Sequence, residues 1–156
     1  MSINNHRISP KKVVRGEGAW FKSLDLIAKL CKRPLIIGRS SSTKKIRTSF
    51  KKDLLLKGIQ AISYELDHDC CELDIQNAYL ISKKNNCDGI IAAGGGKVLD
   101  AGKLIADLLR LNCITVPLSA STCAGWTALS NIYTPCLLYT SPSPRDLSTS
   151  RMPSSA

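Results

Sequence analysis

The sequence predicts an α/β fold in which helices pack on both faces of a parallel β-sheet. Short apolar runs alternate with amphipathic stretches of roughly ten to fifteen residues, the pattern of consecutive strand–helix–strand units. The apolar runs are continuous instead of alternating with polar residues, as expected of parallel strands that are covered on both faces. A chain of 156 residues with 44% hydrophobic content is long enough for one domain with a packed core.

Each expected element has its own local signal. In chain order these elements are a short strand and turn at 13–18, helix 20–32, strand 33–38, helix 42–57, strand 59–66, helix 69–81, strand 88–93, helix 97–110 and strand 113–117. The helices repeat apolar residues three and four positions apart, as Val98, Ala101 and Ile105 do in the last of them. Ser42 or Thr43 is expected to cap the second helix.

The composition excludes several classes of protein. No apolar run approaches the roughly 18–20 residues that span a bilayer, and residues 1–7 lack the apolar core of a secretory signal. The seven cysteines are scattered without a CxxC pair, which favours reduced thiols and a cytoplasmic location. Neither His6 nor His68 has metal-ligand spacing to a cysteine, so no metal site is expected.

The net charge of +10 is concentrated in residues 1–57. Such a basic excess permits nucleic-acid binding. No nucleic-acid motif or interleaved aromatic pattern accompanies it, which favours a solvated basic face that attracts anionic cofactors. We therefore expect neither nucleic acid nor a membrane as a partner, and a basic nucleic-acid-binding module stays a remote alternative.

Three consecutive glycines stand between an expected strand and the helix after it. Because glycine has no Cβ, the backbone of Gly94, Gly95 and Gly96 can turn sharply and approach a ligand closely. The N–H groups and the positive dipole end of the following helix favour an anion there. The run is neither GxGxxG nor a Walker A loop, since Lys97 follows a single glycine triplet without GK[ST]. The sequence therefore predicts a phosphate site of another kind.

Two more loops are expected at the same edge of the sheet as the glycines. Gly38–Ser40 follows the strand at 33–38, and Leu118–Ser121 follows the strand at 113–117. The carboxyl ends of parallel strands share one edge, and open α/β sheets bind their ligands there. We therefore expect the three loops to converge around one ligand.

Three segments and their spacing carry a specific resemblance. Gly94–Lys103, Val116–Thr122 and Thr127–Tyr133 together resemble the iron-containing alcohol dehydrogenase superfamily, most closely its glycerol dehydrogenase branch. The resemblance extends over about Val13–Pro135. It implies a Rossmann-like parallel sheet with flanking helices, the N-terminal nucleotide-binding domain of a dehydroquinate synthase-like fold whose helical C-terminal domain is missing here.

The resemblance also implies a chemistry. Enzymes of this family bind NAD or NADP and move a hydride between an alcohol and the nicotinamide, so the implied partner is a small-molecule alcohol or carbonyl. A divalent metal, zinc or iron, polarises the alcohol. Its aspartate and histidine ligands belong to the helical domain, so neither a metal ligand nor a catalytic residue is assigned in this chain. The piece alone is expected to bind a dinucleotide weakly and to turn over no alcohol, and a homo-oligomer is a possible state of the complete enzyme.

The resemblance assigns cofactor contacts residue by residue. The pyrophosphate would be contacted by Gly94, Gly95, Gly96 and Lys97, and a cofactor hydroxyl or amide by Asp100. The adenine and phosphate side would be lined by Leu118, Ser119 and Ser121. The nicotinamide would be flanked by Thr122, Thr127, Leu129 and Tyr133. Core packing is the alternative role for Leu118, Leu129 and Tyr133. Asp100 would alternatively complement the helix dipole from the first turn.

Two residues depart from the glycerol dehydrogenase pattern. Arg39 stands where the family has an acidic residue that accepts hydrogen bonds from the adenosine ribose, and an arginine tolerates a 2′-phosphate instead. With Ser40–Ser42 and Lys44 nearby, we expect NADP to be used at least as well as NAD. Cys123 stands where an aspartate contacts the polyol, and a thiol cannot accept hydroxyls as a carboxylate does. Glycerol is therefore in doubt as the substrate, and Trp126 indicates a bulkier, more apolar pocket.

Related enzymes provide the alternative to this interpretation. Glycerol-1-phosphate dehydrogenases and sugar-phosphate cyclases share the triple glycine and the nucleotide-binding domain. The downstream segment Thr127–Tyr133 favours the glycerol dehydrogenase branch.

The last stretch of the chain is expected to be foreign to the domain at 1–135. Residues 136–156 lack periodicity and are rich in Ser, Thr and Pro, which alone indicates a disordered tail. Cys136–Asp146 also resembles the translation of a transposase-type sequencing-library adapter, and Ser150–Ala156 resembles the flow-cell end of that adapter. We therefore predict a non-native, disordered tail and a natural reading frame that departs near Pro135.

Overall fold

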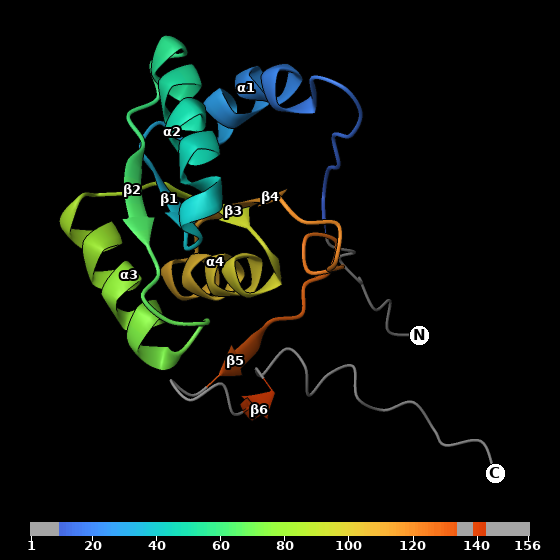
Figure 1. The fold of residues 1–156 in the computed structure, drawn as a ribbon. Coiled ribbons are helices and arrows are strands. Elements are labelled where there is room, and N and C mark those ends of the chain that lie inside the picture. The colour runs from blue at the N-terminus through green and yellow to red at the C-terminus, as the bar shows by residue number, and fades with distance from the viewer. Residues whose placement is uncertain (1–9, 134–138, 143–156) are drawn as a thin grey trace, which may run out of the picture.

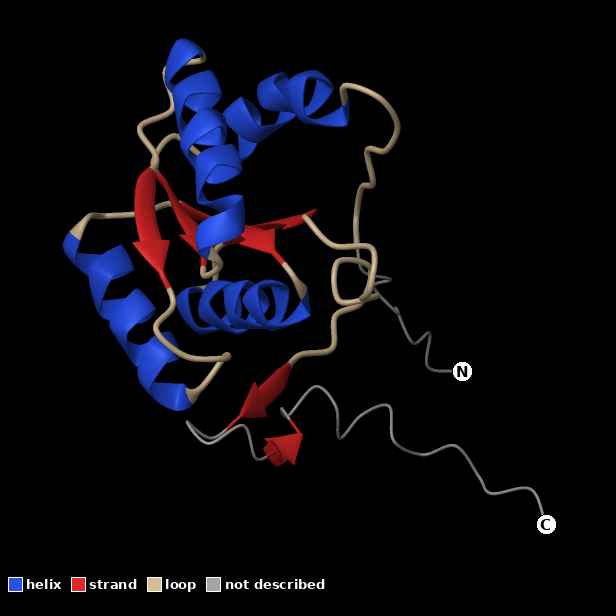
Figure 2. Cartoon of the chain, in the orientation of Figure 1, coloured by secondary structure: helices blue, strands red, loops and turns tan. Residues whose placement is uncertain are grey.

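The computed structural model describes residues 10–133 and 139–142. Helices and parallel strands alternate up to residue 117, and an antiparallel ribbon follows (Figures 1 and 2). The elements are α1 (Ala19–Leu30), β1 (Pro34–Gly38), α2 (Ser41–Leu56), β2 (Ile62–Glu65), α3 (Glu72–Lys84), β3 (Gly89–Gly94), α4 (Gly96–Leu109), β4 (Asn112–Pro117), β5 (Asn131–Tyr133) and β6 (Tyr139–Pro142). The predicted α/β class is confirmed.

The main sheet is parallel, with strand order β2-β1-β3-β4. The chain steps from β1 to β2, returns past β1 to β3 and continues to β4. Right-handed crossovers then require α2 on one face and α3 with α4 on the other, as Figure 1 shows. The chain therefore leaves β1 and β3 toward opposite faces. This switch point opens a crevice at the carboxyl ends of the two strands, where sheets of this type bind ligands.

Both faces of the central strands are buried, as their continuous apolar runs predict. Leu35 and Ile37 of β1 pack with α3 and α4, whereas Ile36 packs with α1 and α2. All three side chains are almost completely buried. Alternate residues thus fill two hydrophobic layers, and these layers fix the strand ends that carry the site.

Of the short strand and turn expected at 13–18, the strand is wrong, because residues 13–15 have no regular secondary structure, whereas residues 16–18 do form a bend and turn. Val13 is 44% exposed and has no strand partner. Gly16 and Gly18 take positive φ angles of 108° and 70°, which turn the chain directly into α1. Two valines followed by two such glycines are too short a run to pair with a sheet edge.

Two helix starts also differ from the expectation. Ser40 is the N-cap residue of α2, so Ser42 and Thr43 lie inside the helix and do not cap it. The Thr43 backbone N–H donates to Ser40 O at 3.2 Å. Helix α3 begins at Glu72 because residues 66–71 form a loop that closes on Asp74, whose carboxylate accepts the backbone N–H groups of Asp67 and His68.

Strand β6 lies inside the segment predicted to be adapter-derived. Its residues 139–142 pair with β5 in an antiparallel ribbon, where the sequence favoured a disordered tail. The rest of 136–156 lies outside the described residues, and the foreign origin of the segment stays a prediction. Within the described ranges, no helix is long and apolar enough to cross a membrane.

Candidate functional site

The glycine turn forms the junction between β3 and α4. Gly94 ends the strand, and Gly95 is the N-cap of the 14-residue helix. None of the three glycines has a positive φ, so the turn needs space for its backbone and no left-handed conformation. A Cβ at Gly94 would lie 2.9 Å from Val98 Cβ, and one at Gly96 would lie 2.8 Å from Thr122 Oγ1.

Gly95 differs from its two neighbours. No atom lies within 4 Å of the position that its Cβ would take. The half-buried Gly95 therefore leaves open space on this side, at the positive end of the α4 dipole and beside helix N–H groups that have no partner within the helix. This combination favours an anion held by backbone atoms.

The loop after β4 lies against the glycine turn. The Leu118 N–H donates to Gly94 O at 3.0 Å, and Thr122 packs on Gly96. Ser119 and Ser121 are exposed, with their hydroxyl oxygens 2.6 Å apart. The structure therefore brings Leu118 and Thr122 to the glycine turn, with Ser119 and Ser121 on the loop between them, as the shared sheet edge predicted.

A single buried carboxylate connects the loops that follow β1, β2 and β3. Asp69, in the loop after β2, is only 7% exposed. Its Oδ2 accepts a hydrogen bond from Lys97 Nζ at 2.8 Å, and its Oδ1 is ion-paired with Arg39. The two cations that the sequence assigned to cofactor phosphates are thus held together. Sequence analysis missed Asp69, although an acidic residue in the loop after a strand, at the ligand-binding edge, was the available signal.

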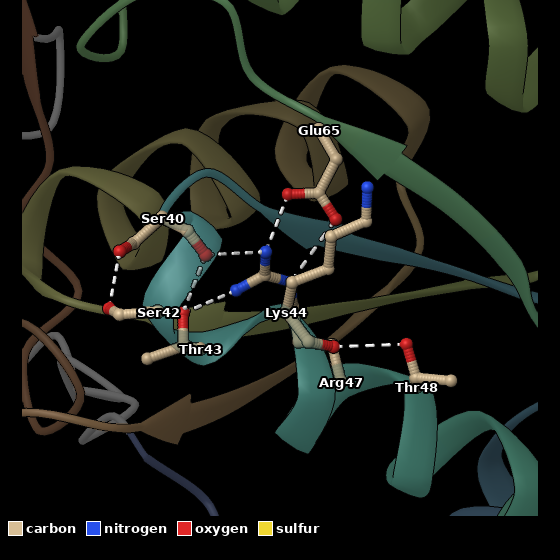
Figure 3. Close-up of polar contacts among 7 residues, drawn as sticks. All are labelled: Ser40, Ser42, Thr43, Lys44, Arg47, Thr48 and Glu65. Atoms are coloured by element: carbon tan, nitrogen blue, oxygen red, sulfur yellow. Dashed lines mark hydrogen bonds and ion pairs between the residues drawn. The ribbon is translucent and has the colours of Figure 1, made fainter.

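A second buried charge holds the start of α2 against the end of β2 (Figure 3). Arg47 is 4% exposed, and its guanidinium is ion-paired with Glu65 through Nη2 at 2.5 Å. Arg47 Nη1 donates to Thr43 Oγ1 at 2.5 Å, and Nη2 donates to Ser40 O at 3.0 Å. The guanidinium lies across Gly38, where any Cβ would overlap it. Arg47 therefore fixes the backbone that presents the serines of this loop.

An open pocket of about 590 Å³ lies beside this arrangement. It is lined by residues of the loop after β1, the first turn of α2 and the end of β2, namely Arg39, Ser40, Ser41, Lys44, Glu65, Leu66 and Asp67. Two cations and two serine hydroxyls at a helix N-terminus suit an anionic group, while the lining also holds the carboxylates of Glu65, which is paired with Arg47, and Asp67. Arg39 borders both this pocket and the Asp69 ion pair.

Asp100 is not placed as predicted. It is the fifth residue of α4, so it lies in the second turn and not in the first, where it would complement the dipole. Its carboxylate is buried and ion-paired with Lys103 Nζ at 2.9 Å. Lys103 Nζ also donates to the backbone oxygens of Thr127, at 3.2 Å, and Leu129. Asp100 thus holds Lys103, and Lys103 in turn holds the segment predicted beside the nicotinamide. The spacing of three residues between Asp100 and Lys103 on one helix could have indicated this ion pair from the sequence.

The remaining predicted residues lie on the segment after β4. Cys123 is an exposed thiol, and its backbone O accepts the Trp126 N–H at 2.8 Å. Leu129 is 39% exposed, so its alternative role in the core is wrong. Tyr133 ends β5, and its side chain lies outside the described part of the structure.

The described cysteines are free thiols. Burial raises the pKa of Cys70 to about 12 and that of Cys31 to about 11. Among the described residues, His68, Cys71 and Asp74 bring three possible metal-ligand atoms within 4.8 Å of one another. Both Asp74 oxygens already accept backbone N–H groups of this loop, so loop closure explains the cluster and we assign no metal to it.

A parallel sheet whose switch point carries a glycine turn, two cations and a cluster of serines has the architecture of the doubly wound nucleotide-binding domains. The chain belongs to the iron-containing alcohol dehydrogenase family, whose model matches residues 10–137. This confirms the family that the three motif segments indicated.

Individual relatives agree with the family match. An uncharacterized oxidoreductase of Synechocystis sp. is 34% identical over 126 residues, which cover 81% of this chain and 32% of the relative. A glycerol dehydrogenase of Citrobacter freundii is 39% identical over 66 residues, covering 42% of this chain and 18% of the relative. The crystal structure of glycerol dehydrogenase from Schizosaccharomyces pombe superposes with a TM-score of 0.70 at 25% identity, covering 91% of this chain and 36% of that one. The chain therefore spans about a third of the length of the Synechocystis oxidoreductase and of the Schizosaccharomyces pombe enzyme.

Proposed function

We propose that this chain is the dinucleotide-binding part of a metal-dependent alcohol or polyol dehydrogenase. The complete enzyme would transfer a hydride between a small alcohol and NAD or NADP, with the corresponding carbonyl as the other substrate. The observation that carries the proposal is the open Gly95 backbone at the N-terminus of α4, at the switch point of the sheet. Glycerol dehydrogenases among the relatives support the substrate class.

The site residues fit a dinucleotide in two places. The backbone of Gly95 and Gly96 with Lys97 suits the pyrophosphate, because helix N–H groups and an ammonium both favour anions. The pocket beside Arg39 and Lys44 suits the adenosine ribose and a 2′-phosphate. These contacts support use of NADP at least as well as NAD.

A divalent metal, zinc or iron, would polarise the alcohol oxygen in the complete enzyme and lower its pKa. The described residues supply no ligand set that we assign to it, so we propose that its ligands lie in a further domain. On the same grounds we propose that this chain binds a dinucleotide but does not turn over alcohol. A cytoplasmic location and a homo-oligomeric complete enzyme are part of the proposal.

Glycerol-1-phosphate dehydrogenase or sugar-phosphate cyclase activity is the alternative. It has less support, because the Synechocystis oxidoreductase and the Citrobacter glycerol dehydrogenase match with higher identity than the glycerol-1-phosphate dehydrogenase does. The genomic locus, read without library adapters, distinguishes these cases. We expect its frame to leave this sequence near Pro135 and to encode an aspartate and histidines in a helical domain. A frame that continued through Cys136–Tyr139 would contradict the adapter origin.

Fluorescence titration of the 156-residue chain with NADH and NADPH tests the binding proposal. The decisive variant is Gly95→Ala, since its Cβ meets nothing in the folded protein and φ is an ordinary −83°. We expect a melting temperature lowered by a few degrees at most, because alanine is a poorer N-cap than glycine. We expect at least about tenfold weaker binding of both dinucleotides, a loss of about 1.4 kcal/mol. Gly96→Ala is the contrast, because its Cβ meets Thr122 and the fold must adjust.

Two results would contradict the proposal. One is the absence of binding of either dinucleotide by the unaltered chain. The other is a Gly95→Ala variant that binds both dinucleotides as the unaltered chain does. Binding of NADH that is tighter than that of NADPH by about tenfold or more would refute the NADP part alone.

A further inference from the structure

We propose that Asp69 is a specificity-determining residue, which favours the dinucleotide without a 2′-phosphate by holding Arg39 and Lys97 on one buried carboxylate. The proposal rests on the proposed function, since it concerns the same dinucleotide site. The sequence alone indicated Arg39 as the residue that decides between NAD and NADP, and the structure adds Asp69 to that decision.

The two carboxylate oxygens have different partners. Oδ2 accepts a hydrogen bond from Lys97 Nζ at 2.8 Å. Oδ1 accepts no hydrogen bond in the structure, and Arg39 is its ion-pair partner. The carboxylate charge is shared by both oxygens, so Lys97 would still compensate it if Arg39 moved away, whereas removal of both cations would leave a buried charge unpaired, which is strongly unfavourable.

The loop prevents Asp69 from following Arg39 outward. On one side, the His68 N–H is bound to Asp74 Oδ2 at 2.9 Å. On the other side, Cys70 has a positive φ of 56°, and its buried thiol donates to Asn131 O at 3.1 Å. Asp69 is fixed between these anchors, whereas the Arg39 side chain is 45% exposed and can swing into the adjacent pocket.

The two dinucleotides differ in what they require from this arrangement. The pyrophosphate, common to both, competes with Asp69 for Lys97 only, and Arg39 can then stay with the carboxylate. A 2′-phosphate also recruits Arg39, so NADP must separate Asp69 from both cations. Asp69 therefore opposes NADP more than NAD, whatever the absolute preference of the unaltered site.

The test compares Asp69→Asn with the unaltered 156-residue chain by titration with NADH and NADPH. Asparagine keeps the shape of the side chain and removes its charge. Both Kd values are expected to fall, because Lys97 is released in each case, and the NADPH value is expected to fall at least about fivefold further. Glu72→Gln is the matched control, because Glu72 is an exposed acid three residues along, outside the pocket.

The outcomes separate the explanations. A fivefold change in the NADPH-to-NADH ratio in Asp69→Asn but not in Glu72→Gln supports the proposal. An unchanged ratio in Asp69→Asn, or an equal change in Glu72→Gln, would overturn it and leave the proposed function intact. If the unaltered chain binds neither dinucleotide, the proposed function fails as well.

Folding is checked by circular dichroism and thermal melting. If Asp69→Asn does not fold, Asp69→Ser is measured against the same criterion. Asp69→Glu keeps the charge and is expected to keep the unaltered ratio. A shift in Asp69→Glu as large as that in the uncharged variant would show that side-chain shape and not charge is responsible, which also overturns the proposal.

Discussion

Replacing Lys103 by methionine is expected to destabilise the fold strongly. Met removes the ammonium while keeping a flexible chain of similar length. The ammonium is buried, ion-paired with Asp100 at 2.9 Å, and donates to the backbone oxygens of Thr127 and Leu129. The substitution therefore leaves a buried carboxylate without its ion-pair partner, and the segment after β4 without its attachment to α4.

The magnitude follows from the burial of the pair. The Lys103 and Asp100 side chains are 9% and 10% exposed, so solvent screens their interaction little. Removing one partner of a buried ion pair costs about 3–5 kcal/mol. We expect the lower end of this range, because Asp100 has further interactions. Since domains of this size are stable by about 5–15 kcal/mol, the loss is readily measured.

The assay is urea denaturation of Lys103→Met, Asp100→Asn and the double variant. If the pair interacts as described, the double variant loses less free energy of unfolding than the two single losses together, with a coupling energy of about 1–3 kcal/mol. Lys57→Met is the matched control, because the ion pair of Lys57 with Asp25 has a similar contact, 2.7 Å, but is exposed. Its unfolding midpoint is expected to stay unchanged within error. A Lys103→Met loss below about 1 kcal/mol, or additive single losses, would refute the reasoning.

Two further predictions concern packing and pH. Gly38→Ala is expected to lower the free energy of unfolding by about 1–3 kcal/mol, because the new Cβ displaces the buried Arg47 guanidinium. Chemical denaturation measures this loss. An unchanged free energy of unfolding would show that Arg47 moves aside without cost. The Cys70 thiol, whose pKa is about 12, stays protonated in the folded chain while the unfolded thiol ionises above about pH 9. The folded state then binds more protons between these pH values, so the free energy of unfolding falls as pH rises through this window. Denaturation at several pH values is expected to show a shallower fall in Cys70→Ala, and equal slopes would contradict the assignment.

Local sequence carried enough information for the fold. Leu35, Ile36 and Ile37 form an uninterrupted apolar run because both faces of β1 are covered, and the run alone indicates this. The glycine triplet likewise marks its own position between strand and helix. The strand expected at Val13 and Val14 was wrong because two β-branched residues favour an extended backbone, but they do not pair with a strand of the sheet.

The ion pairs of the site could not be predicted in the same way. Asp69 and Lys97 are 28 positions apart, and only the strand order brings their loops together. Arg39 was correctly placed at the sheet edge, but its charge partner comes from the loop after a different strand. Residue types at a strand end therefore indicate which side chains gather at one edge of the sheet, whereas the ion pairs among them require the tertiary structure.

The attachment of the segment after β4 has a consequence for how this site can vary. Lys103 reaches the main-chain oxygens of Thr127 and Leu129 and not their side chains. Any residue offers such an oxygen, so substitutions at these two positions can change the side chains that the segment presents while the segment keeps its place. The lysine thus fixes where the segment lies without fixing which side chains it presents, so these side chains can vary without rebuilding the domain.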